Sequence, residues 1–94
     1  MLLKIKELYQ FPPNNRAEKE TRFGQAVKIR QEADEAAEAL KESDERVIEE
    51  TWDVIHAAEG LLRKFPDWKV RLGRARVMVK NARRGDYSNE KKEA

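Results

Sequence analysis

Apolar residues recur every three or four positions along three segments of the chain, and this spacing limits the fold more than any other feature. Such a period places the apolar side chains on one face of an α-helix, whereas a half-buried strand needs strict alternation. We therefore expect three long amphipathic helices, at about residues 15–41, 44–65 and 67–84. In the third segment the apolar positions are Trp68, Leu72, Ala75, Val79 and Ala82.

Helix-breaking residues separate these segments. The run at residues 11–15, Phe-Pro-Pro-Asn-Asn, ends any regular pattern before the first helix, and Pro66 separates the second helix from the third. Asn15 with Glu18 resembles a capping box at the start of the first helix, and Gly85 provides a stop after the third. The connections between the helices are therefore short.

Three amphipathic helices with short connections predict an all-α fold, an antiparallel helical bundle of three main helices. The N-terminal segment or a second subunit could complete it to a four-helix-type bundle. We expect a single domain over residues 1–94, with residues 1–15 as an N-terminal arm and residues 86–94 as a flexible tail. Because 94 residues bury only one small core, a homodimer or homotetramer would be a natural source of extra stability.

The composition agrees with this fold and narrows the chemistry. Charged residues make up 40% of the chain and aromatic residues 7%, which suits long amphipathic helices better than a sheet. There is no cysteine, so a bound metal must be held by oxygen or by the lone His56. No apolar run approaches the ~20 residues of a membrane span, and the start lacks a secretory pattern, so we expect a soluble cytoplasmic protein.

The net charge of +2 conceals an uneven split along the chain. Residues 1–62 carry 9 Lys/Arg and 14 Asp/Glu, a balance of −5, whereas residues 63–94 carry 11 and 4, a balance of +7. An acidic half that binds a cation and a basic half that binds an anion suit a metal-bound polyphosphate. A basic tail alone could equally contact nucleic acid.

Two short acidic stretches repeat one template, in which two carboxylates stand three residues apart and an apolar residue follows. The pairs are Glu32 with Glu35, and Glu50 with Asp53. On helices each pair lies on one face, at the border of the apolar stripe, so both pairs would face the seam between two antiparallel helices. Four converging carboxylates repel one another unless a hard cation such as Mg²⁺ lies among them, with Mn²⁺ as the other candidate. Either pair alone is typical of a solvated helix face.

These acids also carry a resemblance to a known family. The segment Gln31-Glu32-Ala33-Asp34-Glu35, a spacer of 14 residues, and Glu50-Thr51-Trp52-Asp53 resemble the MazG-like branch of the all-α nucleoside triphosphate pyrophosphohydrolases. The pattern of that family is Glu-Glu-x-x-Glu, a spacer, then Glu-x-x-Asp. The likeness covers roughly residues 25–62, and Gln31 departs from it at the place of the first Glu. Residues 80–87 resemble a basic, Asn-containing segment that follows in some members.

The resemblance implies a magnesium-dependent enzyme that cleaves a (deoxy)nucleoside triphosphate between the α- and β-phosphates, releasing a nucleoside monophosphate and pyrophosphate. A dUTPase or a phosphoribosyl-ATP pyrophosphohydrolase shares the acidic bundle, and the sequence does not separate them. Glu35 would also be the candidate general base for the attacking water. The implied metal ligands are Glu32, Glu35, Glu50 and Asp53.

Candidate substrate-binding residues lie outside the acidic stretches. Lys80, Asn81 and Arg84 share the end of the third helix and could bind the outgoing phosphates. A basic helix end that only complements the helix dipole is the alternative. Phe11 and Phe23 are the candidates for a base pocket, which needs aromatic or apolar side chains.

Two other classes of function stay open at this point. In one, the chain is a non-enzymatic nucleic-acid-binding or regulatory protein that uses residues 63–94 as its contact surface. In the other, it is a structural helical oligomer without a ligand. Pyrophosphate release from nucleotides in the presence of magnesium separates the enzyme from both.

Overall fold

The fold is described from a computed structural model, in which residues 8–87 are described. Residues 1–7 of the expected arm and residues 88–94 of the expected tail lie outside the described part. All regular secondary structure in residues 8–87 is helical, as expected. The helices are α2 (Asn15–Lys19), α3 (Arg22–Ala39), α4 (Asp44–Leu62) and α5 (Asp67–Arg83).

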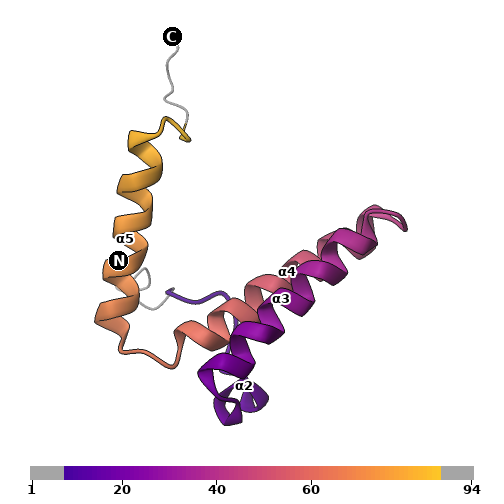
Figure 1. The fold of residues 1–94 in the computed structure, drawn as a ribbon, viewed down its shortest axis with the longest axis horizontal. Helices are drawn as coiled ribbons and strands as arrows, with labels where there is room; N and C mark the ends of the chain where they lie inside the picture. Colours follow the sequence, from indigo (N-terminus) through magenta and orange to yellow (C-terminus); the bar gives the residue numbers. More distant parts are fainter. Residues whose placement is uncertain (1–7, 88–94) are drawn as a thin grey trace.

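Helices α3 and α4 form an antiparallel hairpin, and α2 lies at its open end (Figure 1). The turn between α3 and α4 is short because Ser43 starts α4 at once: its side chain accepts a hydrogen bond from the Arg46 N–H at 3.2 Å. Ala39, at the end of α3, is only 1% exposed. A small side chain at this point lets the two helices approach closely.

The first predicted helix is in fact two helices. Asn14, rather than Asn15, is the N-cap of α2, because its side chain accepts hydrogen bonds from the N–H groups of Arg16 and Ala17. Thr21 has an extended backbone and caps α3 by accepting from the Gly24 N–H at 2.9 Å. The chain therefore turns between Lys19 and Arg22.

Lys64, which follows α4 at the same open end of the hairpin, stabilises this break. Lys64 donates to the carbonyl oxygens of Ala17 at 2.7 Å and Glu20 at 2.6 Å, at the C-terminal end of α2. The Ala17 carbonyl also accepts from the Glu20 N–H at 3.2 Å, and the ammonium group provides a donor to both carbonyls where the regular helical hydrogen bonds end. The break thus depends on a contact between residues 44 or more positions apart.

The segment before α2 is attached to α4 in an extended form. The N–H groups of Gln10 and Phe11 donate to the buried Glu59 carboxylate at 2.7 and 2.9 Å. Arg63 donates to the Phe11 carbonyl oxygen at 2.6 Å, and its guanidinium lies 4.0 Å from the centre of the Tyr9 ring. The described part of the N-terminal segment therefore covers α4 without adding a helix between residues 8 and 14.

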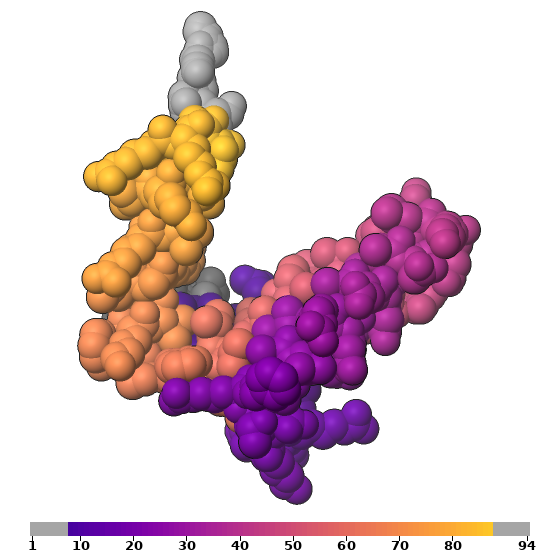
Figure 2. All heavy atoms as spheres, viewed as in Figure 1, coloured from indigo at the N-terminus to yellow at the C-terminus, as the bar shows by residue number. Residues whose placement is uncertain are grey.

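Helix α5 has the predicted limits but not the predicted packing. It begins after Pro66 and ends before Gly85, which adopts a positive φ of 79°. It leads away from the hairpin instead of lying along it (Figures 1 and 2). The predicted three-helix bundle within one chain is therefore not confirmed, and Trp68, on the apolar stripe of α5, is 63% exposed.

None of the helices in the described part of the chain combines the length and the hydropathy that crossing a bilayer requires.

Replacing Gly60 by Ala tests the packing of α4 against α2 and α3. A Cβ atom at this position would lie 2.8 Å from the Ala17 Cβ and 2.9 Å from the Gln25 Nε2. We expect Gly60→Ala to lower the free energy of unfolding by about 1–3 kcal/mol through overpacking. This loss should appear although Ala is the better helix former.

The matched control is Gly73→Ala on α5, where an added Cβ meets nothing within 4 Å. It should raise the free energy of unfolding by up to about 1 kcal/mol. Urea unfolding followed by circular dichroism measures both variants. An equal gain in stability at the two positions would contradict the close packing at Gly60.

Candidate metal centre

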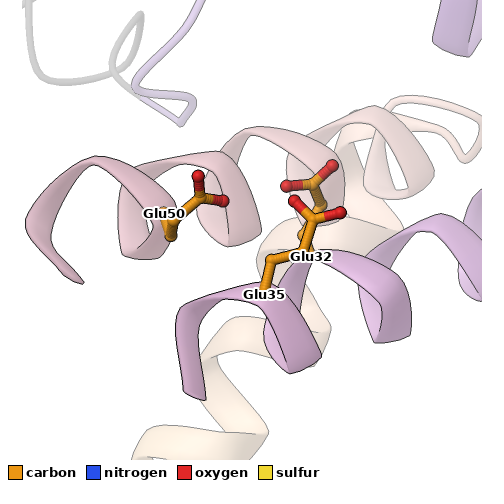
Figure 3. A group of neighbouring side chains, drawn as sticks. All are labelled: Glu32, Glu35 and Glu50. Atoms are coloured by element: carbon orange, nitrogen blue, oxygen red, sulfur yellow. The ribbon is translucent and has the colours of Figure 1, made fainter. Parts of the chain in front are cut away.

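Three carboxylates from the two helices of the hairpin come together in the structure. Glu32 and Glu35 project from α3 and Glu50 projects from α4, and each contributes an oxygen within 4.8 Å of the others. Figure 3 shows the three side chains reaching toward a common space between the helices. Three of the four predicted ligands thus form one cluster.

The hairpin explains this convergence. Glu32 and Glu35 stand one turn apart on α3, so they share a face. Glu50 is the seventh residue after the Ser43 cap, while Glu35 and Glu32 precede Leu40, which ends α3, by 5 and 8 residues. In antiparallel helices, residues at similar distances from the turn lie opposite each other. The short turn therefore aligns the two acidic stretches.

The cluster lies at the boundary between the helix interface and solvent. The side chains of Glu32 and Glu50 are only 10% and 8% exposed, whereas Glu35 is exposed. With the carboxylates ionised, the buried oxygen Oε1 of Glu50 has no hydrogen-bond partner. A buried carboxylate oxygen without a partner is costly, and a bound cation is one group that would satisfy it. The donor set therefore fits a metal ion.

Two basic side chains partly compensate the buried acids. Lys28 Nζ lies 2.9 Å from Glu32 Oε2, and Arg46 Nη2 lies 2.8 Å from Glu50 Oε2. Each basic residue stands four positions before its acid on the same helix. The sequence pattern did not single out these residues, although this spacing was the signal that could have found them.

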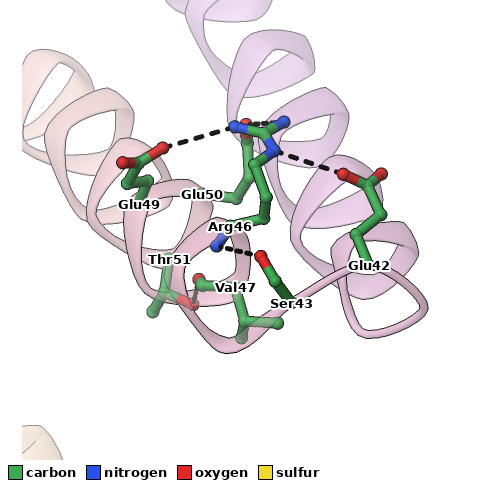
Figure 4. A network of polar contacts seen from close by, with 7 residues as sticks. All are labelled: Glu42, Ser43, Arg46, Val47, Glu49, Glu50 and Thr51. Carbon is green, nitrogen blue, oxygen red and sulfur yellow. Dashed lines mark hydrogen bonds and ion pairs between the residues drawn. The ribbon is translucent and has the colours of Figure 1, made fainter.

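The guanidinium of Arg46 is shared among several acids (Figure 4). Besides Glu50 it contacts the more exposed carboxylates of Glu42 at 3.3 Å and Glu49 at 3.4 Å. Its charge is therefore divided between the buried cluster and the surface. Three clustered carboxylates face Lys28 and a shared Arg46, so the cluster keeps an excess of negative charge.

The excess negative charge raises the pKa of Glu35, the exposed carboxylate of the cluster. The negative charge of Glu32 raises the pKa of Glu35, and partial desolvation and the charge of Glu50 act in the same direction. Hydrogen bonding to Glu32, together with its charge, raises the pKa of Lys28 and keeps its ammonium group protonated. Glu35 therefore holds a proton more readily than an isolated glutamate does.

Asp53, the fourth predicted ligand, is not part of the cluster of three. It lines a neighbouring cavity of about 380 Å³ in which Glu32 also takes part. The cavity is bounded by residues of α2, α3 and α4, and His56 of α4 is among them. The role of Asp53 as a metal ligand stays a prediction.

The predicted phosphate-binding residues lie at the far end of α5. Lys80 and Arg84 line a shallow cavity along that helix, and the Asn81 amide donates to the Tyr87 hydroxyl at 3.4 Å. Arg84 Nη1 is also 3.8 Å from Asp86 Oδ2. Because α5 leads away from the hairpin, one chain does not bring these residues to its own acidic cluster (Figure 1).

The two predicted base-pocket residues have different surroundings. The Phe11 ring is half-buried, stacks on His56 at a centroid distance of 4.5 Å and meets Trp52 edge-on at 5.8 Å. Phe23, at the start of α3, is 79% exposed. Within residues 8–87 the ring contacts of Phe11 are with His56 and Trp52, not with Phe23. A base pocket made by both residues in one chain stays a prediction.

Comparison with protein-family models, with characterised proteins and with solved structures finds no match for this chain. The resemblance to the MazG-like enzymes therefore rests on the spacing of the acids, and the geometry of the hairpin carries the functional argument.

The raised pKa of Glu35 predicts how a divalent cation changes stability with pH. Because the folded chain holds this proton more tightly than the unfolded chain, the proton stabilises the fold at acid pH. That contribution is lost as the pH rises through the folded-state pKa. A bound cation would replace it. The difference between the Tm in MgCl2 and the Tm in EDTA should therefore grow between about pH 4 and about pH 7.

Glu35→Gln should reduce the difference between the Tm in MgCl2 and the Tm in EDTA, because the substitution removes both a repelling charge and a metal ligand. Glu38→Gln, one turn further along α3, is the control, since the Glu38 side chain is largely exposed and forms a surface ion pair with Lys41. Differential scanning fluorimetry at several pH values measures each Tm. A magnesium-dependent shift of the same size in both variants would exclude Glu35 from the site.

Proposed function

We propose that this protein is a magnesium-dependent nucleotide pyrophosphohydrolase that cleaves a nucleoside triphosphate between its α- and β-phosphates. The observation that carries the proposal is the convergence of Glu32, Glu35 and Glu50 from two antiparallel helices, with one buried oxygen of Glu50 unpartnered. All-oxygen donor sets favour Mg²⁺ and Mn²⁺ over softer metals. The spacing of the acids along the sequence adds the resemblance to the MazG-like family.

The geometry of the cluster supports the following ligand set. Glu32, Glu35 and Glu50 would hold the ion, and Asp53, beside Glu32 at the adjoining cavity, would complete the set if it turned toward the cluster. Gln31, which stands where the family pattern has its first Glu, is exposed and at most would bond a coordinated water. The partial burial of Glu32 and Glu50 makes their ionisation without a cation costly, which couples the site to metal binding.

The residues suit hydrolysis of a phosphoanhydride. A bound Mg²⁺ supplies neutralisation of phosphoryl oxygens and a more acidic water. Glu35 is the most exposed carboxylate of the cluster, so it is the member most accessible to the attacking water. It would accept the proton of the water that attacks the α-phosphorus. The bond from that phosphorus to the bridging oxygen breaks, and pyrophosphate leaves with the bonding electron pair.

We further propose that a second copy of the chain completes the bundle. Helix α5 keeps large apolar residues exposed, among them Trp68, Leu72 and Val79, and α4 exposes Ile48 and Trp52. Exposed apolar surface on this scale is typical of an interface. Pairing of two copies would cover these residues, and it would be the route by which Lys80, Asn81 and Arg84 reach the acids of a partner chain.

The neighbouring residues Glu49 and Glu50 offer a matched test of the enzyme. Glu50 lies in the cluster and is buried, whereas Glu49 is on the adjacent surface. With a panel of ribo- and deoxyribonucleoside triphosphates and MgCl2, we expect pyrophosphate release by the wild type. Glu50→Gln should lower the rate by about 10²-fold or more, by analogy with other lost charge-stabilising groups.

Glu49→Gln should keep the rate within a few-fold of the wild type, because Arg46 retains its bond to Glu50. Removal of divalent ions by EDTA should abolish release in all variants. If no nucleotide releases pyrophosphate, and the chain instead binds RNA or DNA with a steep salt dependence, the exposed basic face of α5 becomes the functional surface.

The proposed association has its own test. Leu72→Glu places a charge on the exposed apolar stripe of α5 and should convert the oligomer to a monomer. Size-exclusion chromatography with light scattering measures the mass of each species. Gly73→Ala, next in the chain and open to solvent, should leave the mass unchanged. A wild-type monomer at high protein concentration would contradict the proposal.

A further inference from the structure

A cavity of about 380 Å³ adjoins the acidic cluster on the side of α2. Its lining includes Arg16 from α2, Lys28 and Glu32 from α3, and Asp53 and His56 from α4. Glu32 belongs both to this cavity and to the cluster of three carboxylates. A molecule in the cavity would therefore lie directly beside an ion held by the cluster.

The lining suits an anion better than a nucleobase. Its only apolar residues are Ala17 and Ala57, so there is no large apolar wall or Phe or Trp ring against which a base could stack. The Gln25 amide is already bonded to the Ala57 carbonyl oxygen at 3.0 Å. The hydrogen-bond donors that remain for a ligand are mainly the cationic groups of Arg16 and Lys28, which suit phosphate oxygens.

The charges of the cavity depend on the metal. Without an ion, Arg16 and Lys28 supply +2, whereas Glu20, Glu32 and Asp53 supply −3, which leaves −1. A divalent ion bound at Glu32 changes this balance to +1. The same ion would compete with Lys28 for Glu32, where the ammonium lies 2.9 Å from the carboxylate. Metal binding would thus free Lys28 and make the cavity attractive to an anion.

Arg16 is available for such a ligand. Its side chain is exposed, and no carboxylate in the described residues lies within ion-pair distance of it. Arg16 and Lys28 line the same cavity and carry like charges, which repel each other. An anion between them would relieve this repulsion. The position of Arg16 is maintained by the Asn14 cap and by Lys64, which holds the end of α2.

We infer that this cavity binds the terminal diphosphate of the substrate, the part that leaves as pyrophosphate, through Arg16 and Lys28 of the same chain that supplies the acids. The inference rests on the proposed function. It assigns the outgoing phosphates to α2 and α3 rather than to Lys80, Asn81 and Arg84 on α5. It also makes binding of the diphosphate and of the metal mutually dependent.

Isothermal titration calorimetry with inorganic pyrophosphate, in excess MgCl2, tests the inference on the full chain. Arg16→Gln should lower the affinity about tenfold or more, the effect of losing a charge-assisted hydrogen bond. Arg16→Lys should recover part of it. Arg30→Gln, an exposed arginine of α3 that does not line the cavity, is the control and should bind as the wild type does.

The same titration with a nucleoside monophosphate is the second comparison, because this ligand lacks the terminal diphosphate. Its affinity should be the same in the wild type and in Arg16→Gln. Equal pyrophosphate affinity in Arg16→Gln and Arg30→Gln would overturn the inference, as would equal losses for pyrophosphate and monophosphate.

The rise of Tm with MgCl2 distinguishes failure of the cavity assignment from failure of the proposed metal site. If Arg16→Gln retains that rise but binds pyrophosphate normally, only the cavity assignment fails, whereas no rise in the wild type removes the metal site and the inference with it.

Discussion

The close antiparallel packing of α3 against α4 is the constraint on which the rest of the structure depends. Small residues permit it at both ends, with Ala39 near the turn and Gly60 against Gln25 of α3 at the open end. This packing holds Glu32 and Glu50 in a partly buried seam, where like charges repel more strongly than in water. The fold therefore maintains an excess of negative charge that Lys28 and Arg46 only partly compensate, and a cation would relieve it.

Residues 8–65 and helix α5 differ in how closely they pack against the rest of the chain. The hairpin, α2 and the extended segment that Glu59 and Arg63 hold against α4 form one packed body. Helix α5 has the same amphipathic pattern, but no other helix among residues 8–87 packs along most of its length (Figure 2). An amphipathic helix gains most of its stability from burying its apolar face, so α5 is the element that most needs a partner. This is the physical basis for proposing a second copy.

Local patterns predicted much of the secondary structure and part of the site. The limits of α5 agree with the apolar period, Pro66 and Gly85, because these signals act within one turn of helix. Helix α4 begins at Asp44 as predicted but ends at Leu62, three residues before the predicted end. The break at Glu20 and Thr21 was missed because the bonds from Lys64 that support it come from 44 or more residues away. Lys28 and Arg46 were missed although their spacing from the acids is local, because the likeness to the MazG-like family was read from the acids and from residues 80–87.

By itself, the sequence determined that residues 8–87 are helical, where α5 begins and ends, and that two carboxylate pairs lie on helix faces, because each follows from neighbours within a few positions. The tertiary structure alone decided which carboxylates converge, and it left Asp53 beside an adjoining cavity. It also decided that α5 leads away from its own hairpin and that Arg16 meets Lys28 at that cavity. Such outcomes depend on the turn length, the α2 break and the packing distance between helices, which no helical period encodes.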